Sequence, residues 1–170
     1  MTKPHSSRAP LPAAGGLTTR GAPANAPHNP GTPLPAALAV STGYVLSKAA
    51  QRAVETFEAA LRPLGIRSRH YGVLTLLVED GPLSQQVLGE RLRVDRTTMV
   101  AVVDDLERLG LAERRRDPAD RRAYAIHPKP AGEETLTRAR ALLAAAEDAI
   151  FAPLSAAERH QLRDLLMRLV

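Results

Sequence analysis

The sequence predicts a mainly α-helical protein that carries one small β-hairpin. Hydrophobic residues make up 44% of the 170 residues but aromatic residues only 3%, so the core must consist largely of Leu, Val and Ala. Ala and Leu favour helices. Apolar residues also recur at helical spacing over most of the chain beyond residue 36. One short segment instead alternates around a turn sequence, as the two strands of a hairpin do.

Residues 1–35 differ from the rest of the chain and predict a disordered Pro/Gly/Ala-rich tail. They contain eight of the fourteen prolines, four glycines and no acidic residue. Such a segment cannot bury enough apolar surface to offset the entropy that it loses on ordering. The folded domain is therefore predicted to span residues 36–170, which is an ordinary length for one domain.

Two helices are expected at the start of this domain. Apolar residues at helical spacing predict a long first helix over about 36–63, which Pro63 and Gly65 end. Ser68 is the expected cap of a second helix, because its hydroxyl can accept a hydrogen bond from the first turn. Gly81, followed by a proline, ends that helix.

The next segment predicts two short helices joined by a tight turn; it reads LSQQVLGERLRVDRTTMVAVVDDLERLG. Ser84 and Asp95 are placed to cap the two helices, and Gly110 to end the second. The apolar residues of the second helix fall on one face: Met99, Val102, Val103, Leu106 and Leu109. Helices joined in this way match the helix-turn-helix of DNA-binding proteins, whose second helix enters the major groove. Periodicity alone does not distinguish this arrangement from another small helical hairpin.

A hairpin follows directly. Residues 111–115 and 122–126 have the pattern of strands, and the segment DPAD between them is typical of a turn. A hairpin attached behind a helix-turn-helix is called a wing. The stretch RRRDPADRR, residues 114–122, holds five arginines in nine residues, and the whole chain carries a formal charge of +5. This charge favours a polyanionic partner, although charge alone fits a merely soluble basic protein equally well.

Two further helices complete the chain. An Ala- and Leu-rich helix is expected over about 131–152, where Pro153 interrupts it. Ser155 is then placed to cap a last helix, with Glu158 three residues further on as its partner in a capping box.

In this order, the elements resemble the MarR family of winged-helix transcription regulators. Three segments carry the resemblance: RHYGVLTLLVEDGPLSQQVLGERLRVDRTTMVAVVDDLERLGLAERRRDPADRR, PAGEETL and LSAAERHQLRDLL. The resemblance implies a DNA-binding lobe at about 66–128 and dimerisation helices at about 36–63 and 131–170. It also implies a homodimer that acts on a pseudo-palindromic operator in double-stranded DNA, as a repressor that responds to a small aromatic or phenolic effector.

The candidate DNA contacts lie on three elements. In the recognition helix they are Asp95, Arg96, Thr97, Thr98 and Val100. On the wing they are Arg114, Arg115, Arg116, Asp120, Arg121 and Arg122. At the start of the helix-turn-helix, Ser84 and Gln85 are candidates for holding the DNA backbone. By resemblance, Arg122 enters the minor groove, where arginine is the residue usually inserted, and Asp120 holds its guanidinium.

Several of these candidates, and two neighbouring carboxylates, have an interpretation that does not involve DNA. Asp95 is also explained as a helix cap, since a carboxylate beside phosphate is unfavourable. Ser84 and Gln85 are equally explained as a plain N-cap and a solvated side chain. The adjacent carboxylates Asp104 and Asp105 are interpreted as solvated. Relatives often carry Arg at position 105.

By the same resemblance, an effector pocket would lie near Tyr44, Arg67, His70 and Tyr71. A phenol or carboxylate could bond to the tyrosine or histidine, and an arginine could neutralise an anion. The alternative is that Tyr71 belongs to the core and that His70 is a satisfied histidine at the surface or at an interface.

No sequence motif points to catalysis, a cofactor or a metal. The chain has no cysteine, and we find no Gly-rich phosphate loop and no nucleophile motif. It has no apolar run of the ~18 residues that a membrane helix needs. We therefore expect a cytoplasmic protein that is not an enzyme. The alternatives to a sequence-specific regulator are a nonspecific basic DNA-architectural protein and a winged helix used for protein contacts.

Overall fold

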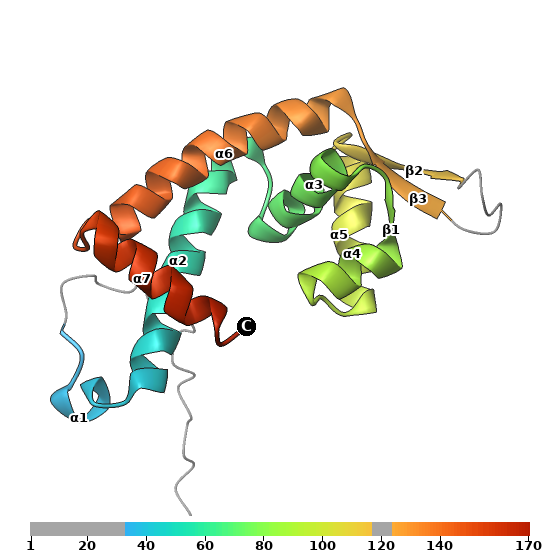
Figure 1. Ribbon diagram of the computed structural model, residues 1–170. Helices are drawn as coiled ribbons and strands as arrows, with labels where there is room; N and C mark the ends of the chain where they lie inside the picture. Colours follow the sequence, from blue (N-terminus) through green and yellow to red (C-terminus); the bar gives the residue numbers. More distant parts are fainter. Residues whose placement is uncertain (1–32, 117–123) are drawn as a thin grey trace, which may run out of the picture. The chain divides into compact units, whose positions relative to one another are not determined.

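The computed structural model describes residues 33–116 and 124–170, and its folded unit is Ala36–Val170. Figure 1 shows a mainly helical chain with one small sheet, as the sequence predicts. The elements are α1 (Ala36–Ala39), α2 (Thr42–Leu61), the 3-10 turn η1 (Arg62–Leu64), α3 (Ser68–Asp80), β1 (Leu83–Ser84), α4 (Gln85–Leu92), α5 (Arg96–Arg108), β2 (Ala112–Arg116), β3 (Tyr124–Pro128), α6 (Pro130–Ile150) and α7 (Ala156–Met167).

One hydrophobic core joins the helix-turn-helix to the long helices. Its largest fully buried side chains come from six different elements: Leu61, Leu74, Leu77, Leu88, Met99, Leu106, Ile126 and Leu136. Each buried Leu, Ile or Met contributes about 1.5–3 kcal/mol relative to an exposed one. The predicted apolar face of α5 is confirmed except at its end, since Leu109 follows the last helical turn and is 38% exposed.

The sheet has three antiparallel strands in the order β1-β3-β2. Its central strand β3 pairs Ile126 with Leu83 of β1 on one side and with Arg114 of β2 on the other. The two-residue strand β1 was not predicted, because two residues are too few to show an alternating pattern. Through β1, the residues that lead into α4 are bonded to the wing.

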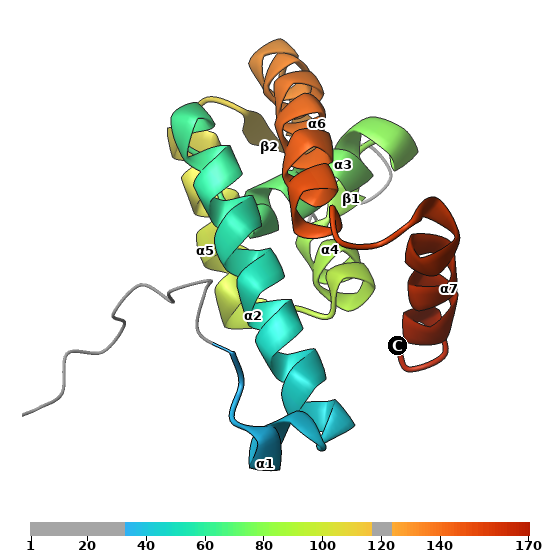
Figure 2. The ribbon, with the colours of Figure 1, turned by 90° about the vertical axis from the view of Figure 1, so that its left-hand side faces the viewer.

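The long helix predicted over 36–63 is divided in the structure. Its first turn is the separate helix α1, and α2 begins after Ser41, whose hydroxyl accepts a hydrogen bond from the N–H of Tyr44 (3.4 Å). Serine at this position caps a helix, and this interrupts an otherwise continuous apolar pattern. Beyond the break, α2 packs along α6, as Figure 2 shows from a second direction.

The predicted cap of the second helix is wrong. Ser68 is the first residue of α3 rather than its cap, and its N–H donates to the carboxylate of Glu58 (2.9 Å). The N–H of Arg67 donates to Nδ1 of His70 (3.1 Å). Glu58 belongs to α2, so the acceptor that satisfies this helix end comes from another element and leaves no local pattern.

The last two helices begin close to where they are predicted. Pro130 is the first residue of α6, a position that suits proline because the N–H it lacks would have no partner there. The capping box of α7 is confirmed: the Ser155 hydroxyl accepts from the N–H of Glu158 (3.3 Å), and the Glu158 carboxylate accepts from the N–H of Ser155 (2.8 Å). No residue of α7 is buried.

Candidate nucleic-acid interface

The helix-turn-helix is formed by α4, a tight turn and α5. The Ser84 hydroxyl accepts from the N–H of Val87 (3.3 Å), which confirms the cap of α4. Arg93 then turns the chain in the left-handed conformation (φ 52°, ψ 43°), and the N–H of Val94 donates to the carbonyl of Gly89 (2.9 Å). Left-handed backbone is uncommon for a residue other than glycine, so the surrounding contacts hold Arg93 in it.

Asp95 caps the recognition helix α5. One carboxylate oxygen accepts from the N–H of Thr98 (2.9 Å), and the other accepts from its hydroxyl (2.6 Å). The hydroxyl bond and then the backbone bond from Thr98 are the main causes that lower the pKa of Asp95 below its ordinary value. The observed geometry is therefore that of the helix cap, and the Thr98 hydroxyl already donates to a partner within the protein.

Three of the predicted DNA contacts of α5 lie on its solvent side. Arg96, Thr97 and Val100 are exposed, whereas Met99 and Val102 on the opposite side are buried. A surface hollow of about 650 Å³ extends between α4 and α5, and it brings together four of the candidates: Gln85, Asp95, Arg96 and Val100.

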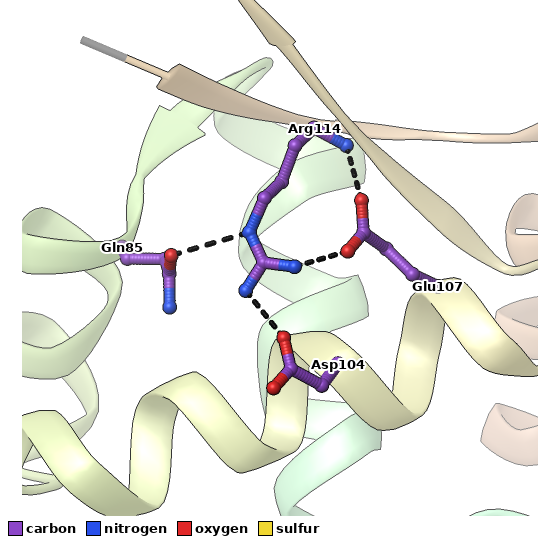
Figure 3. A network of polar contacts seen from close by, with 4 residues as sticks. All are labelled: Gln85, Asp104, Glu107 and Arg114. Atoms are coloured by element: carbon purple, nitrogen blue, oxygen red, sulfur yellow. Dashed lines mark hydrogen bonds and ion pairs between the residues drawn. The ribbon is translucent and has the colours of Figure 1, made fainter.

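Arg114 lies at the centre of a polar network rather than on open surface (Figure 3). Its guanidinium contacts the carboxylate of Glu107 through Nη1 and that of Asp104 through Nη2, the second at 2.7 Å. Its Nε donates to Oε1 of Gln85 (3.3 Å). Gln85 is thus partly buried against Arg114 and is not the solvated side chain that the sequence suggested, whereas Asp104 is exposed as expected and in addition pairs with Arg114.

The rest of the wing is described only in part. Arg115 is exposed and pairs with Glu113 on the same strand, and Arg116 is exposed at the end of β2. Asp120, Arg121 and Arg122, predicted at the tip, lie outside the described residues. The structure therefore leaves the predicted minor-groove contact untested.

The four predicted effector residues do not form one group within a single chain. Tyr44 lies in the first turn of α2 and Arg67 follows its other end, so a helix of twenty residues, about 30 Å long, separates them. Tyr71 packs against the core. A hollow of about 320 Å³ lies beside Arg67, and its lining includes Glu58 and Arg62, which the sequence did not single out.

His70 is buried, with 5% of its surface exposed. Its Nδ1 accepts from the N–H of Arg67, and its Nε2 lies 3.6 Å from Oδ2 of Asp105 on α5. Burial lowers the pKa of His70, and the charge of Asp105 opposes this shift. The second interpretation of His70 is therefore right that the ring has partners within the protein but wrong about its place, since the ring is buried and not at the surface. Asp105, which faces Nε2, is not merely solvated.

Three comparisons with known proteins agree with this geometry. Residues 64–123 match the family model described as the MarR family. A candidate transcriptional regulatory protein for the hcr operon of Thauera aromatica is 33% identical over 151 residues, which cover 88% of this chain and 90% of that protein.

Two crystal structures are also similar to this chain. One is a MarR-family protein of Rhodococcus sp. RHA1, which is 30% identical with a TM-score of 0.71 over 79% of this chain and 96% of that one. The other is CouR of Rhodococcus jostii RHA1 bound to p-coumaroyl-CoA, which is 31% identical with a TM-score of 0.70 over 79% and 95%.

Proposed function

The chain belongs to the MarR family of winged-helix, DNA-binding transcriptional regulators, and from this we propose that it acts as a homodimeric repressor on a pseudo-palindromic operator. One observation carries the proposal. The capped helix α5 exposes Arg96, Thr97 and Val100 beside a wing whose central strand is bonded to the residues that lead into α4. A reading helix and a basic hairpin are thus held in one unit, as binding to neighbouring grooves requires.

Exposed apolar residues on the terminal helices support the homodimer. Val54 on α2 is 57% exposed, and Leu165 and Met167 on α7 are 48% and 67% exposed. A third hollow, of about 630 Å³ between α6 and α7, is lined in part by Phe151 and Leu166. A second copy of the chain that packs against these helices would cover such side chains.

A homodimer fixes the form of the operator. Its two recognition helices would enter successive major grooves about 34 Å apart, so the half-sites would be centred roughly 10 base pairs apart. We further propose that the protein acts in the cytoplasm, where this DNA is found. Independently, none of the described helices has the length and apolar character that crossing a membrane requires.

We also propose a small aromatic or phenolic effector. CouR, a protein similar to this chain, has been crystallised with p-coumaroyl-CoA. Arg62 and Arg67 border the hollow at the junction of α2 and α3, and they could neutralise the anionic group of such a ligand. The ligand would release DNA only if it bound the conformation that does not bind DNA more tightly.

A gel-shift competition tests the proposed function. The protein is first footprinted on the promoters next to its own gene, and the protected duplex is then challenged with random duplex and with a half-site duplex. We expect a preference for the protected site of about a thousandfold or more over random DNA. Equal competition would instead indicate the nonspecific DNA-architectural protein, and an absence of salt-dependent binding would indicate a protein-interaction module.

A promoter fusion that becomes more active when the gene is deleted identifies a repressor.

A further inference from the structure

Arg114 joins the wing to both helices of the helix-turn-helix. It lies on β2, and its guanidinium contacts Gln85 on α4 together with Asp104 and Glu107 on α5. The backbone N–H of Arg114 also donates to the Glu107 carboxylate (2.7 Å), so this carboxylate binds both the backbone and the guanidinium of Arg114. These contacts are shown in Figure 3.

The electrostatics of this cluster do not suit a phosphate contact. Two carboxylates face one guanidinium, so the three charged groups carry a net charge of −1 at neutral pH. The Arg114 side chain is only 23% exposed, and each of its three nitrogens already contacts an acceptor. A phosphate would have to displace a carboxylate and approach the other. Arg115, which is 61% exposed, is much better placed to meet DNA.

We propose that Arg114 is a positioning residue, which sets the angle between the wing and the recognition helix and does not itself contact DNA. This inference rests on the proposed DNA interface. Two elements that enter neighbouring grooves together bind more tightly when their relative orientation is held before binding, because ordering them on the DNA would cost binding free energy. The planar guanidinium suits this task, since it binds acceptors in fixed directions.

Conservative variants separate positioning from phosphate contact. Lysine keeps the positive charge and binds phosphate well, but its ammonium cannot reproduce the fixed fork of the guanidinium. We expect Arg114→Lys to weaken operator binding by about tenfold, as expected when coupled contacts are lost. Glu107→Gln should also weaken operator binding, although it removes a negative charge near the DNA. The double variant Arg114→Lys/Glu107→Gln should bind about as weakly as the weaker of the two single variants.

The salt dependence of binding supplies the second readout. Each phosphate contact contributes about 0.9 to the slope of log K against log salt concentration. Neither Arg114→Lys nor Arg114→Met should change this slope, whereas Arg115→Met, the matched control, should reduce it by about 0.9 if Arg115 meets a phosphate. Circular dichroism and sedimentation establish whether each variant is folded and dimeric. If the Arg114 variants do not fold or assemble, Glu107→Gln still tests the proposal.

Wild-type affinity in Arg114→Lys, a reduced slope in Arg114→Met, or tighter binding by Glu107→Gln would each overturn the positioning role. A wild-type protein that does not prefer its operator would instead refute the proposed function, so the two failures can be told apart.

Discussion

The Nε2 atom of buried His70 lies 3.6 Å from Oδ2 of Asp105, and this contact joins α3 to the recognition helix α5. Because Nδ1 accepts a hydrogen bond from the N–H of Arg67, the proton of the neutral ring belongs on Nε2, the atom that faces the carboxylate. The imidazole therefore connects the start of α3, next to the proposed effector region, with the helix proposed to read DNA.

The stability of the protein should depend on the protonation of His70. Burial lowers the pKa of this imidazole below its ordinary value of about 6.5, and Arg67 lowers it further, while Asp105 and Glu58 oppose the shift. Below pH ~6.5 the unfolded chain therefore gains a proton that the folded protein does not. The free energy of unfolding should fall as the pH drops, by at most about 1.4 kcal/mol per pH unit for this one group.

Urea denaturation between pH 8 and 5.5, at one protein concentration, measures this dependence. His70→Gln should have a flatter profile than the wild type. His160→Gln is the matched control, because His160 has a side chain that is 68% exposed on α7. Identical profiles for the wild type and His70→Gln would show that the buried imidazole does not titrate as described.

Much of the fold could be predicted from the sequence because its signals are local. The caps at Ser84, Asp95 and Ser155 each act on an N–H three residues away, so the residue types and their spacing are enough to identify them. Gly110 ends α5 in the left-handed conformation (φ 71°) that glycine adopts without strain. The apolar side of α5 follows from helical periodicity in the same way.

The candidate site was less predictable, because its contacts join distant parts of the chain. In the sequence, Arg114 looks like a DNA-binding residue because it lies in an arginine-rich turn. Only the packing of β2 on α5 brings Asp104 and Glu107 to its guanidinium. His70 of α3 likewise contacts Asp105 of α5, thirty-five residues further along the chain. A charged side chain near a basic turn is ambiguous in sequence, because the same residue type serves both phosphate binding and an internal ion pair.

Gly132 should not tolerate a side chain. It lies in the first turn of α6, where a Cβ atom would overlap the backbone carbonyl oxygen of Leu111 and crowd Leu74. That same carbonyl accepts a hydrogen bond from the N–H of Lys129 (3.0 Å), so it cannot move away without loss. We expect Gly132→Ala to lower the free energy of unfolding by about 1–3 kcal/mol.

Gly43→Ala is the matched control for this effect. Gly43 also lies near the start of a helix, but a Cβ atom there would meet nothing within 4 Å. Alanine should stabilise that helix by about 0.5–1 kcal/mol. Denaturant titration of the two variants should therefore give changes of opposite sign, and a stabilised Gly132→Ala would contradict the close approach of α6 to Leu111.

The charge of Asp95 should weaken DNA binding while its oxygen caps α5. Asparagine caps a helix about as well as aspartate, so Asp95→Asn should keep the bond from the N–H of Thr98 and leave the melting temperature nearly unchanged. It should bind operator DNA severalfold more tightly, because a carboxylate near the phosphates is removed. Asp95→Ala should lower the melting temperature, since the cap is lost. Weaker binding by the asparagine variant would instead indicate that Asp95 reads a base.

The wing tip should contribute more to DNA affinity than the hydroxyl of Thr98 does. Arginine placed in a narrow minor groove meets a concentrated negative potential, so we expect Arg122→Ala to weaken operator binding by well over tenfold, or more than about 1.4 kcal/mol. Thr98 already donates its hydroxyl to Asp95 (2.6 Å), which leaves it less able to bind phosphate. Gel-shift titrations of both variants at one salt concentration compare the two residues. Unchanged affinity in Arg122→Ala would remove the wing from the mechanism, and a larger loss in Thr98→Ala would reverse the order of the two elements.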